Sequence, residues 1–310
     1  MKPFRFGINA RTIGTASEWT ERARRLEDQG YATLNLPDHL VAMLAPLPAL
    51  AIAAAATRRL RVGTMVLNND FRHPVVLARE AATLDLLSDG RLELGVGAGH
   101  MKVEYDEVGL AFDRGQVRVE RLAEAVAIVK RLFTGEPVTY DGRHYRVTGH
   151  TIHPPPVQRP RPPILIGGNG PRLLTLAAAE ADIVGFTGIT FARGGAAPEF
   201  SGFRAADVDT RLSLVQQAAG ARFDQLELNA LLQRVIVTDD ARAAAEELTQ
   251  RWTSLPADDV LASPFVLIGS VDEMVAQLQA RRQRWGLSYY VTQEAYADAL
   301  APVVARLTGL

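Results

Sequence analysis

Two histidines follow apolar runs of the kind that form buried strands. His39 comes after residues 33–36, and His100 comes after residues 91–96. Imidazole exchanges protons near neutral pH, so a histidine at a strand end is a candidate acid, base or hydrogen-bond donor. Asp38 precedes His39 and can bias its charge. We therefore predict His39, Asp38 and His100 as catalytic residues; the alternative for the Asp38–His39 pair is a helix-capping aspartate beside a structural histidine.

A glycine cluster, GVGAG at 95–99, stands directly before His100. A dinucleotide-binding fingerprint would need glycine at position 100 and a helix immediately afterwards. The next predicted helix starts only near residue 118, so we reject that interpretation. We expect instead that these glycines let a flat ligand lie close to the backbone.

A second cluster, Gly167-Gly168-Asn169-Gly170, lies between a predicted strand and a helix that begins near Pro171. Exposed backbone N–H groups and the helix dipole favour a phosphate there. The alternative is a tight turn that requires glycine. No G-K-[ST] sequence follows, which excludes a triphosphate-binding P-loop.

Three other histidines are weaker candidates for a catalytic or metal-binding role. His73 precedes Pro74 at a predicted helix start and is expected to cap that helix. His150 and His153 lie in a proline-rich stretch with no carboxylate or third ligand near them in sequence. We therefore predict no metal site.

Eight strand-like runs, each followed by a helix-like run, place these candidates in space. The runs lie at 4–9, 33–36, 61–66, 91–96, 164–166, 182–186, 226–236 and 287–292. This pattern predicts an α/β protein with a (β/α)8 TIM barrel, with insertions after strands four and six, and a doubly wound sheet is the alternative. No linker divides the chain, so we expect one domain over residues 1–310. In either fold, ligands bind at the carboxyl ends of the strands, where the candidate residues lie.

Several local features are also predicted. Ser17 is a plausible N-cap for a helix over 18–29, and Asp141-Gly142 indicates a hairpin within 138–147. Residues 187–203 lack periodicity and are rich in glycine, so we expect a loop that can close over a substrate.

Composition excludes several classes of function. The 310 residues carry a net charge of −1 with no basic run, which argues against a nucleic-acid or membrane-surface binder. The absence of cysteine excludes a thiolate nucleophile and a disulfide. The start of the chain enters a strand pattern without an apolar signal region, and the apolar run 40–56 contains Pro46 and Pro48. We therefore expect a cytoplasmic protein with no membrane segment.

Several motifs together resemble the luciferase-like monooxygenase superfamily, and more closely its branch that uses the deazaflavin coenzyme F420. They are PDH at 37–39, VGTMVLNNDFRHP at 62–74, GRLELGVGAGH at 90–100, GGNGPRLL at 167–174, FTGEPVTYDGRHY at 133–145 and LIGSVDEMVAQL at 267–278. The resemblance covers nearly the whole chain.

The resemblance implies a barrel that holds the ring of the coenzyme in its carboxyl mouth. A cis peptide at Met65-Val66 would lie behind the ring, and Asn68 would contact the ring's polar edge. His39 corresponds to the active-site histidine of the deazaflavin branch, and a homodimer is expected from the family. The cofactor-binding residues expected from the motifs and the resemblance are Met65, Val66, Asn68, Gly97, Gly99, His100, Gly167, Gly168, Asn169 and Gly170.

The chain departs from the family at one position. Glucose-6-phosphate dehydrogenases of the family carry glutamate where this chain has His100, which argues against sugar-phosphate oxidation. The expected activity is hydride transfer between C5 of coenzyme F420 and a small organic substrate, with reduction of C=C, C=N or C=O and a proton from His39 or His100. The alternatives are an FMN-dependent monooxygenase that uses reduced flavin and oxygen, and a barrel that binds its cofactor without catalysis.

Overall fold

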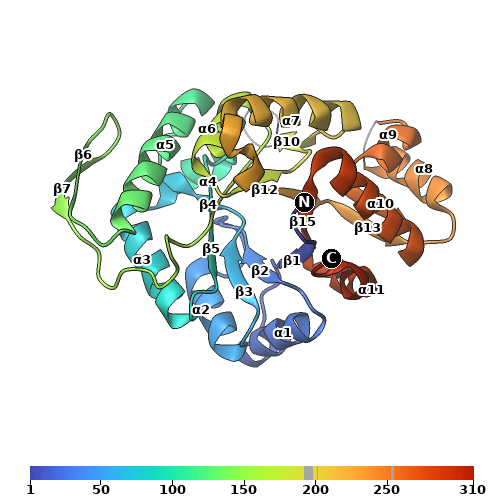
Figure 1. Ribbon diagram of the computed structural model, residues 1–310, viewed down its shortest axis with the longest axis horizontal. Coiled ribbons are helices and arrows are strands. Elements are labelled where there is room, and N and C mark those ends of the chain that lie inside the picture. The colour runs from blue at the N-terminus through green and yellow to red at the C-terminus, as the bar shows by residue number, and fades with distance from the viewer. Residues whose placement is uncertain (192–197, 201, 253–254) are drawn as a thin grey trace.

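Eight parallel strands close into a barrel at the centre of the molecule (Figure 1). The computed structural model describes residues 1–191, 198–200, 202–252 and 255–310. The barrel strands are β1 (Arg5–Asn9), β2 (Thr33–Leu36), β3 (Arg61–Thr64), β5 (Leu92–Gly97), β8 (Ile164–Gly167), β9 (Ile183–Phe186), β12 (Glu227–Leu232) and β15 (Leu287–Gln293). Pairing of β3 with β5 closes the ring, and the short strand β4 (Leu67–Asn68) continues the pairing with β5. The predicted TIM barrel is confirmed, and the doubly wound alternative is wrong.

Helices lie around the outside of the strands (Figure 1). They are α1 (Ala16–Asp28), α2 (Pro46–Ala56), α3 (Pro74–Leu87), α5 (Gly115–Leu132), α6 (Pro171–Glu180), α7 (Ala205–Ala219), α10 (Val271–Trp285) and α11 (Ala297–Leu307). Short 3-10 turns occur at Asn69–Phe71, Gly220–Gln225 and Glu294–Tyr296. The two ends of the chain lie together, since the Phe4 N–H donates to the Leu310 carbonyl at 3.1 Å.

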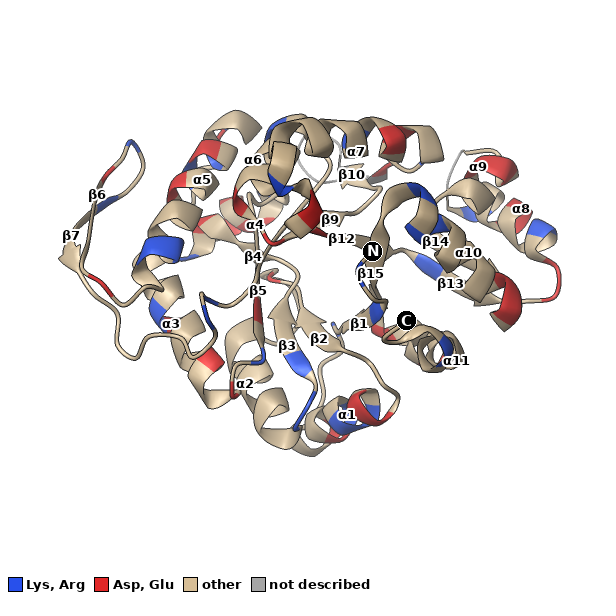
Figure 2. Cartoon of the chain, in the orientation of Figure 1, with Lys and Arg blue, Asp and Glu red and all other residues tan. Residues whose placement is uncertain are grey.

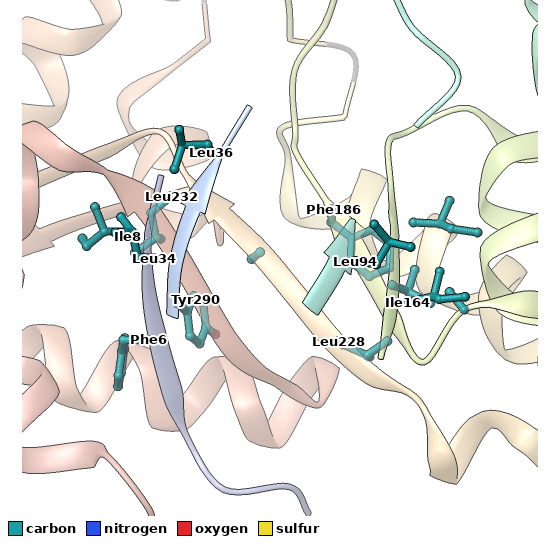
Figure 3. Close-up of a cluster of buried hydrophobic side chains, with 14 of the residues drawn as sticks. Phe6, Ile8, Leu34, Leu36, Leu94, Ile164, Phe186, Leu228, Leu232 and Tyr290 are labelled. Atoms are coloured by element: carbon teal, nitrogen blue, oxygen red, sulfur yellow. The ribbon is translucent and has the colours of Figure 1, made fainter. Parts of the chain in front are cut away.

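The main core lies between the strands and the helices. Side chains alternate along each strand, so one set faces the helices and the other faces the barrel axis. The helix-facing set is apolar and buried (Figure 3), and it includes Phe6, Ile8, Leu34, Leu94, Ile164, Phe186, Leu228 and Tyr290. Charged side chains of both signs are spread over the outer helices (Figure 2).

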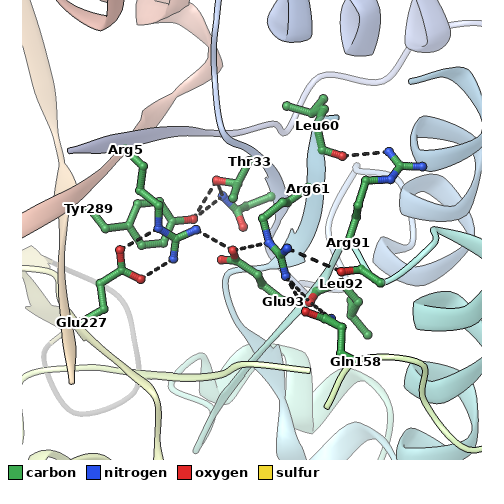
Figure 4. A network of polar contacts seen from close by, with 12 residues as sticks. Arg5, Thr33, Leu60, Arg61, Arg91, Leu92, Glu93, Gln158, Glu227 and Tyr289 are labelled. Carbon is green, nitrogen blue, oxygen red and sulfur yellow. Dashed lines mark hydrogen bonds and ion pairs between the residues drawn. The ribbon is translucent and has the colours of Figure 1, made fainter. Parts of the chain in front are cut away.

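A network of buried charges fills the amino-terminal end of the barrel (Figure 4). Arg5 bonds Glu93 and Glu227, each at 2.5 Å, and Arg61 bonds Glu93 at 2.7 Å. The Arg5 guanidinium also lies 3.7 Å from the ring centroid of Tyr289. Burial raises the pKa of Glu93, but the charges of Arg5 and Arg61 outweigh it and lower the pKa below its ordinary value. The base of the barrel is therefore closed by paired charges.

The insertions follow the fourth and sixth barrel strands. After β5 come α4 (Lys102–Glu107) and, beyond α5, the hairpin of β6 (Val138–Asp141) and β7 (Arg146–His150). After β9 come β10 (Thr190–Phe191) and β11 (Pro198–Glu199). Residues 192–197 and 201 of the loop predicted to close over a substrate lie outside the described residues, so that closure stays a prediction.

Two local predictions need correction. The N-cap of α1 is Thr15 rather than Ser17, because Thr15 and Glu18 form a reciprocal capping box. The long strand predicted over 226–236 is two strands: β12 stays in the barrel, and β13 (Arg234–Val237) leaves it to pair with β14 (Val266–Gly269). Helices α8 (Ala241–Arg251) and α9 (Ala257–Ala262) contact β14. The sequence also did not predict α4.

The described part of the chain lacks two further features. None of their helices is long and apolar enough to span a bilayer. None of their histidine, aspartate and glutamate side chains form a group of three or more that could hold a metal ion.

The network at the barrel base predicts a large stability effect. Removing the buried carboxylate in Glu93→Ala leaves two half-buried guanidinium groups short of a partner, so the free energy of unfolding should fall by about 2–4 kcal/mol. In Asp141→Ala, the lost ion pair with Arg146 is mostly exposed, and the change should stay below about 1 kcal/mol. Urea denaturation of both variants measures this difference, and equal small losses would contradict the role assigned to Glu93.

Candidate active site

An apolar platform lies inside the carboxyl mouth of the barrel. Met65, Val66 and Leu231 are partly buried and pack on a cluster of fully buried residues deeper in the barrel, Leu165, Ile183, Tyr289 and Val291. The Met65-Val66 peptide bond is cis, as the resemblance predicts. A surface of this kind suits one face of a planar, largely apolar group.

Asp38 is turned toward the segment after β3 and makes no described contact with His39. Its carboxylate accepts hydrogen bonds from both terminal nitrogens of Arg72, at 2.5 and 3.2 Å, and from the Asn68 backbone N–H at 3.0 Å. The expectation that Asp38 acts on His39 is therefore not supported by these contacts. Asp38 joins the loop after β2 to the loop after β4, and a catalytic role for it stays a prediction.

The side chain of Asn68 is buried at the same edge. Its Oδ1 accepts hydrogen bonds from the Tyr105 hydroxyl at 2.9 Å and from the Asp70 backbone N–H at 3.1 Å. Asp70 in turn forms an ion pair with Arg121 of α5 at 2.8 Å. These bonds hold Asn68 in one orientation, which a ligand-contacting side chain requires.

The glycines of β5 make room for the protein itself. A Cβ on Gly97 would lie 2.6 Å from Cγ2 of Val66, and a Cβ on Gly99 would lie 2.0 Å from the Tyr105 hydroxyl. Gly99 also has a φ of +72°, which side-chain-bearing residues rarely adopt. Their missing side chains therefore allow the cis Met65-Val66 segment and Tyr105 to approach β5. The expectation that they also let a flat ligand lie close to the backbone stays a prediction.

His39 and His100 meet at the mouth, as their strand-end positions predict. Their ring centroids are 5.3 Å apart and the rings are nearly perpendicular. The Nδ1 atom of His39 lies 3.1 and 3.2 Å from the two carboxylate oxygens of Glu104 on α4. The carboxylate that contacts His39 is thus Glu104.

His100 lies in a positively charged surrounding. The ring keeps an exposed edge, but desolvation by its neighbours and the charges of His39, Arg11 and Arg118 lower its pKa below the ordinary value. Arg118 also donates to the carbonyl oxygens of Ala98 at 3.1 Å and Gly99 at 3.4 Å, which fixes the turn that carries His100. The lowered pKa favours the uncharged imidazole at neutral pH, and this form can donate or accept a hydrogen bond.

The turn 167–170 leads into an open helix end. Gly170 is the N-cap of α6, no side chain caps the helix, and Pro171 is its first residue. The side-chain amide of Asn169 donates to the Thr187 hydroxyl at 2.9 Å and to the Ile189 carbonyl at 2.8 Å, so it ties the loops after β8 and β9 together. Arg211 of α7 donates to the Asn169 carbonyl at 3.1 Å. Backbone N–H groups beside an arginine make this a suitable place for an anion.

The sequence analysis missed three residues that organise this site: Arg72, Glu104 and Tyr105. Each acts on a partner more than 30 positions away, namely Asp38, His39 and Asn68. A weak signal existed for two of them, because Glu104 and Tyr105 lie four and five positions after the strand-end residue His100.

Comparison with known proteins identifies the family of the chain. The luciferase-like monooxygenase family model matches residues 2–286. An F420-dependent glucose-6-phosphate dehydrogenase from Nakamurella multipartita is 35% identical over 266 residues, which cover 82% of this chain and 73% of that protein.

Two solved structures share the fold. The coenzyme F420 dependent tetrahydromethanopterin reductase from Methanopyrus kandleri has a TM-score of 0.78 and 18% identity over 99% of both chains. The monooxygenase RslO1 from Streptomyces bottropensis has a TM-score of 0.72 and 25% identity over 98% of this chain and 97% of its own.

The crowding at Gly97 predicts that even one added methyl group disturbs the mouth. Gly97→Ala should lower the free energy of unfolding by about 1–3 kcal/mol, because the new Cβ would overlap Val66. Gly115→Ala is the matched control: Gly115 begins α5 and a Cβ there meets nothing within 4 Å, so stability should be unchanged or slightly higher. Thermal unfolding distinguishes the two, and a neutral Gly97→Ala would contradict the close approach.

Proposed function

The chain belongs to the luciferase-like monooxygenase family, and from this we propose that it is a coenzyme F420-dependent oxidoreductase acting on a small organic substrate. The observation that carries the proposal is the meeting of an apolar platform, Met65 and Val66, with the pair of imidazoles, His39 and His100, at one barrel mouth. The 35% identity to an F420-dependent dehydrogenase supports the same cofactor.

The residues present suit this coenzyme. The platform at Met65-Val66 matches a planar ring, and the uncapped start of α6 at Gly168–Gly170 matches a phosphate. Asn9 at the carboxyl end of β1 has a buried Oδ1 without a hydrogen-bond partner among the described residues, so an acceptor is available near the mouth. When bound, the deazaflavin accepts or gives a hydride at C5.

The protein's own residues then orient the reactants and handle the proton. In reduction of C=C, C=N or C=O, one substrate atom gains the hydride and its neighbour gains a proton. His39 is placed to hold that proton, and the uncharged His100 beside it is placed to hydrogen-bond the polar atom of the substrate. Since His100 replaces the glutamate expected of sugar-phosphate oxidation, we propose a substrate other than glucose 6-phosphate.

Two other activities remain as outcomes of the test. Likeness to a monooxygenase keeps the FMN-dependent, oxygen-consuming reaction as the second candidate. The third candidate is a barrel that binds a cofactor without turnover. In that case wild type has no activity, and His39→Ala changes none.

The first experiment measures the equilibrium binding of coenzyme F420 and of FMN to the apo-protein, with fluorescence quenching as the readout. The proposal expects a micromolar or lower Kd for F420 and at least about tenfold weaker binding of FMN, a gap of about 1.4 kcal/mol. Reduced F420 would then be screened with unsaturated substrates. Preference for FMN, with substrate-dependent oxygen consumption, would overturn the proposal.

The α6 terminus offers a sharper test of the phosphate site. Gly170→Asp places a carboxylate where we propose the phosphate, and a Cβ there meets nothing within 4 Å. Aspartate is itself a good N-cap, so the fold should persist while F420 binding weakens by about tenfold or more through charge repulsion. Gly170→Asn, a neutral residue of the same size, should bind at least about tenfold more tightly than Gly170→Asp, and equal affinities of the two variants would place the phosphate elsewhere.

We also propose a homodimer. Exposed apolar side chains lie on α2 and α3, with Ile52 50%, Val76 49% and Leu87 67% exposed. Arg79 and Glu80 line the adjacent groove, and a two-fold interface pairs such opposite charges across the axis. Location in the cytoplasm and a single domain over residues 1–310 stay predictions.

Sedimentation velocity tests the dimer. Wild type at about ten micromolar should sediment as a dimer, and Val76→Glu with Leu87→Glu should sediment as a monomer, because burying two carboxylates without partners opposes association. Val237→Glu, at an exposed apolar residue of β13, is the control and should stay dimeric. A monomeric wild type would contradict the proposed homodimer.

A further inference from the structure

One buried carboxylate at the mouth has no part in the chemistry described so far. Glu104 is only 2% exposed and lies on α4, the short helix after β5. Its Oε1 accepts the backbone N–H of Leu40 at 2.9 Å, and its two oxygens lie 3.1 and 3.2 Å from Nδ1 of His39. A single side chain thus holds both the loop after β2 and the ring of His39.

These contacts fix the proton positions on His39. A carboxylate only accepts hydrogen bonds, so Nδ1 must carry a hydrogen that it donates to Glu104. Nε2 lies on the other side of the ring, away from Glu104, and is the nitrogen left to meet a ligand. The imidazole side chain is 14% exposed, and the ring of His100 stands edge-on to it.

The other charged groups near Glu104 and His39 are positive or are paired elsewhere. Arg11 after β1, His100 after β5 and Arg118 of α5 bring positive charge or basic nitrogens to this part of the mouth. The neighbouring carboxylate, Asp38, is paired with Arg72. On the exposed side of α4, Lys102 and Asp106 pair with each other. Glu104 is therefore the carboxylate that contacts the His39 ring.

We propose that Glu104 is a positioning residue that keeps His39 protonated at Nδ1 and presents Nε2 to the substrate as the site of proton transfer. The inference rests on the proposed function and names the proton route for it. In the reductive direction, the Nε2–H bond breaks and the proton goes to the substrate atom next to the carbon that receives the hydride. His39 is left neutral with its Nδ1–H still bonded to Glu104, and solvent restores the proton at Nε2.

The first test is independent of cofactor and substrate. Long-range ¹H–¹⁵N NMR of the apo-protein at about pH 8 reads which ring nitrogen carries hydrogen, with His39→Ala assigning the signals. Wild type should show the Nδ1–H tautomer. Glu104→Gln can accept from Leu40 while its amide N–H donates to Nδ1, so its His39 should switch to Nε2–H. An Nε2–H tautomer in wild type would overturn the proposal.

The second test uses activity. Glu104→Gln should lower kcat by about 10²-fold or more, because the carboxylate no longer supports the cationic acid, while the Kd for F420 changes less than about threefold. Glu104→Asp should recover part of kcat, and Asp106→Asn on the exposed side of α4 should behave as wild type.

The outcomes separate the two proposals. Loss of kcat, of F420 affinity and of melting temperature together in Glu104→Gln, with His39 still in the Nδ1–H tautomer, would make Glu104 merely structural and overturn the inference. The predicted tautomers in a protein that binds FMN instead of F420 would overturn the proposed function and leave the positioning role standing.

Discussion

Closure of an eight-stranded barrel leaves an interior just wide enough for side chains. The width of this interior determines which residues can lie at the base and at the mouth of the barrel. At the base, Arg5, Glu93 and Glu227 fill the space as paired charges. Higher up, the missing side chain of Gly97 lets Val66 lie close against β5. Only then is there an apolar surface at the carboxyl mouth on which a flat molecule can lie.

The same limit explains how the mouth is built from distant parts of the chain. Each strand end contributes one or two polar residues, and each needs a partner from another loop to keep its orientation. Arg72 holds Asp38, Tyr105 holds Asn68 and Glu104 holds His39. A ligand would therefore meet side chains whose directions are already fixed, which lowers the entropy lost on binding.

The fold was predictable because the barrel strands are short apolar runs separated by helical periodicity. The meeting of His39 with His100 was also predictable, since the carboxyl ends of parallel strands share one edge. The cis bond at Met65-Val66 came from the resemblance alone, because nothing in the residue types requires it.

The partners of the site residues could not be predicted. Helix α4 has six residues, too few for a periodic pattern, so Glu104 carried no signal of its burial. Glu104 and Asp38 are both acidic residues near His39 in the fold, and the sequence favoured Asp38 because it is adjacent in the chain. Likewise, β12 and β13 form one apolar run, and only tertiary pairing of β13 with β14 separates them.

The central claim is that this mouth holds a deazaflavin with His39 beside its reactive carbon. A crystal structure of the protein with coenzyme F420 tests it most directly. We predict the ring against Met65-Val66, the phosphate at the start of α6, and Nε2 of His39 on the face of the ring open to substrate. A ring bound away from the Met65-Val66 segment, or a phosphate far from Gly170, would contradict the account.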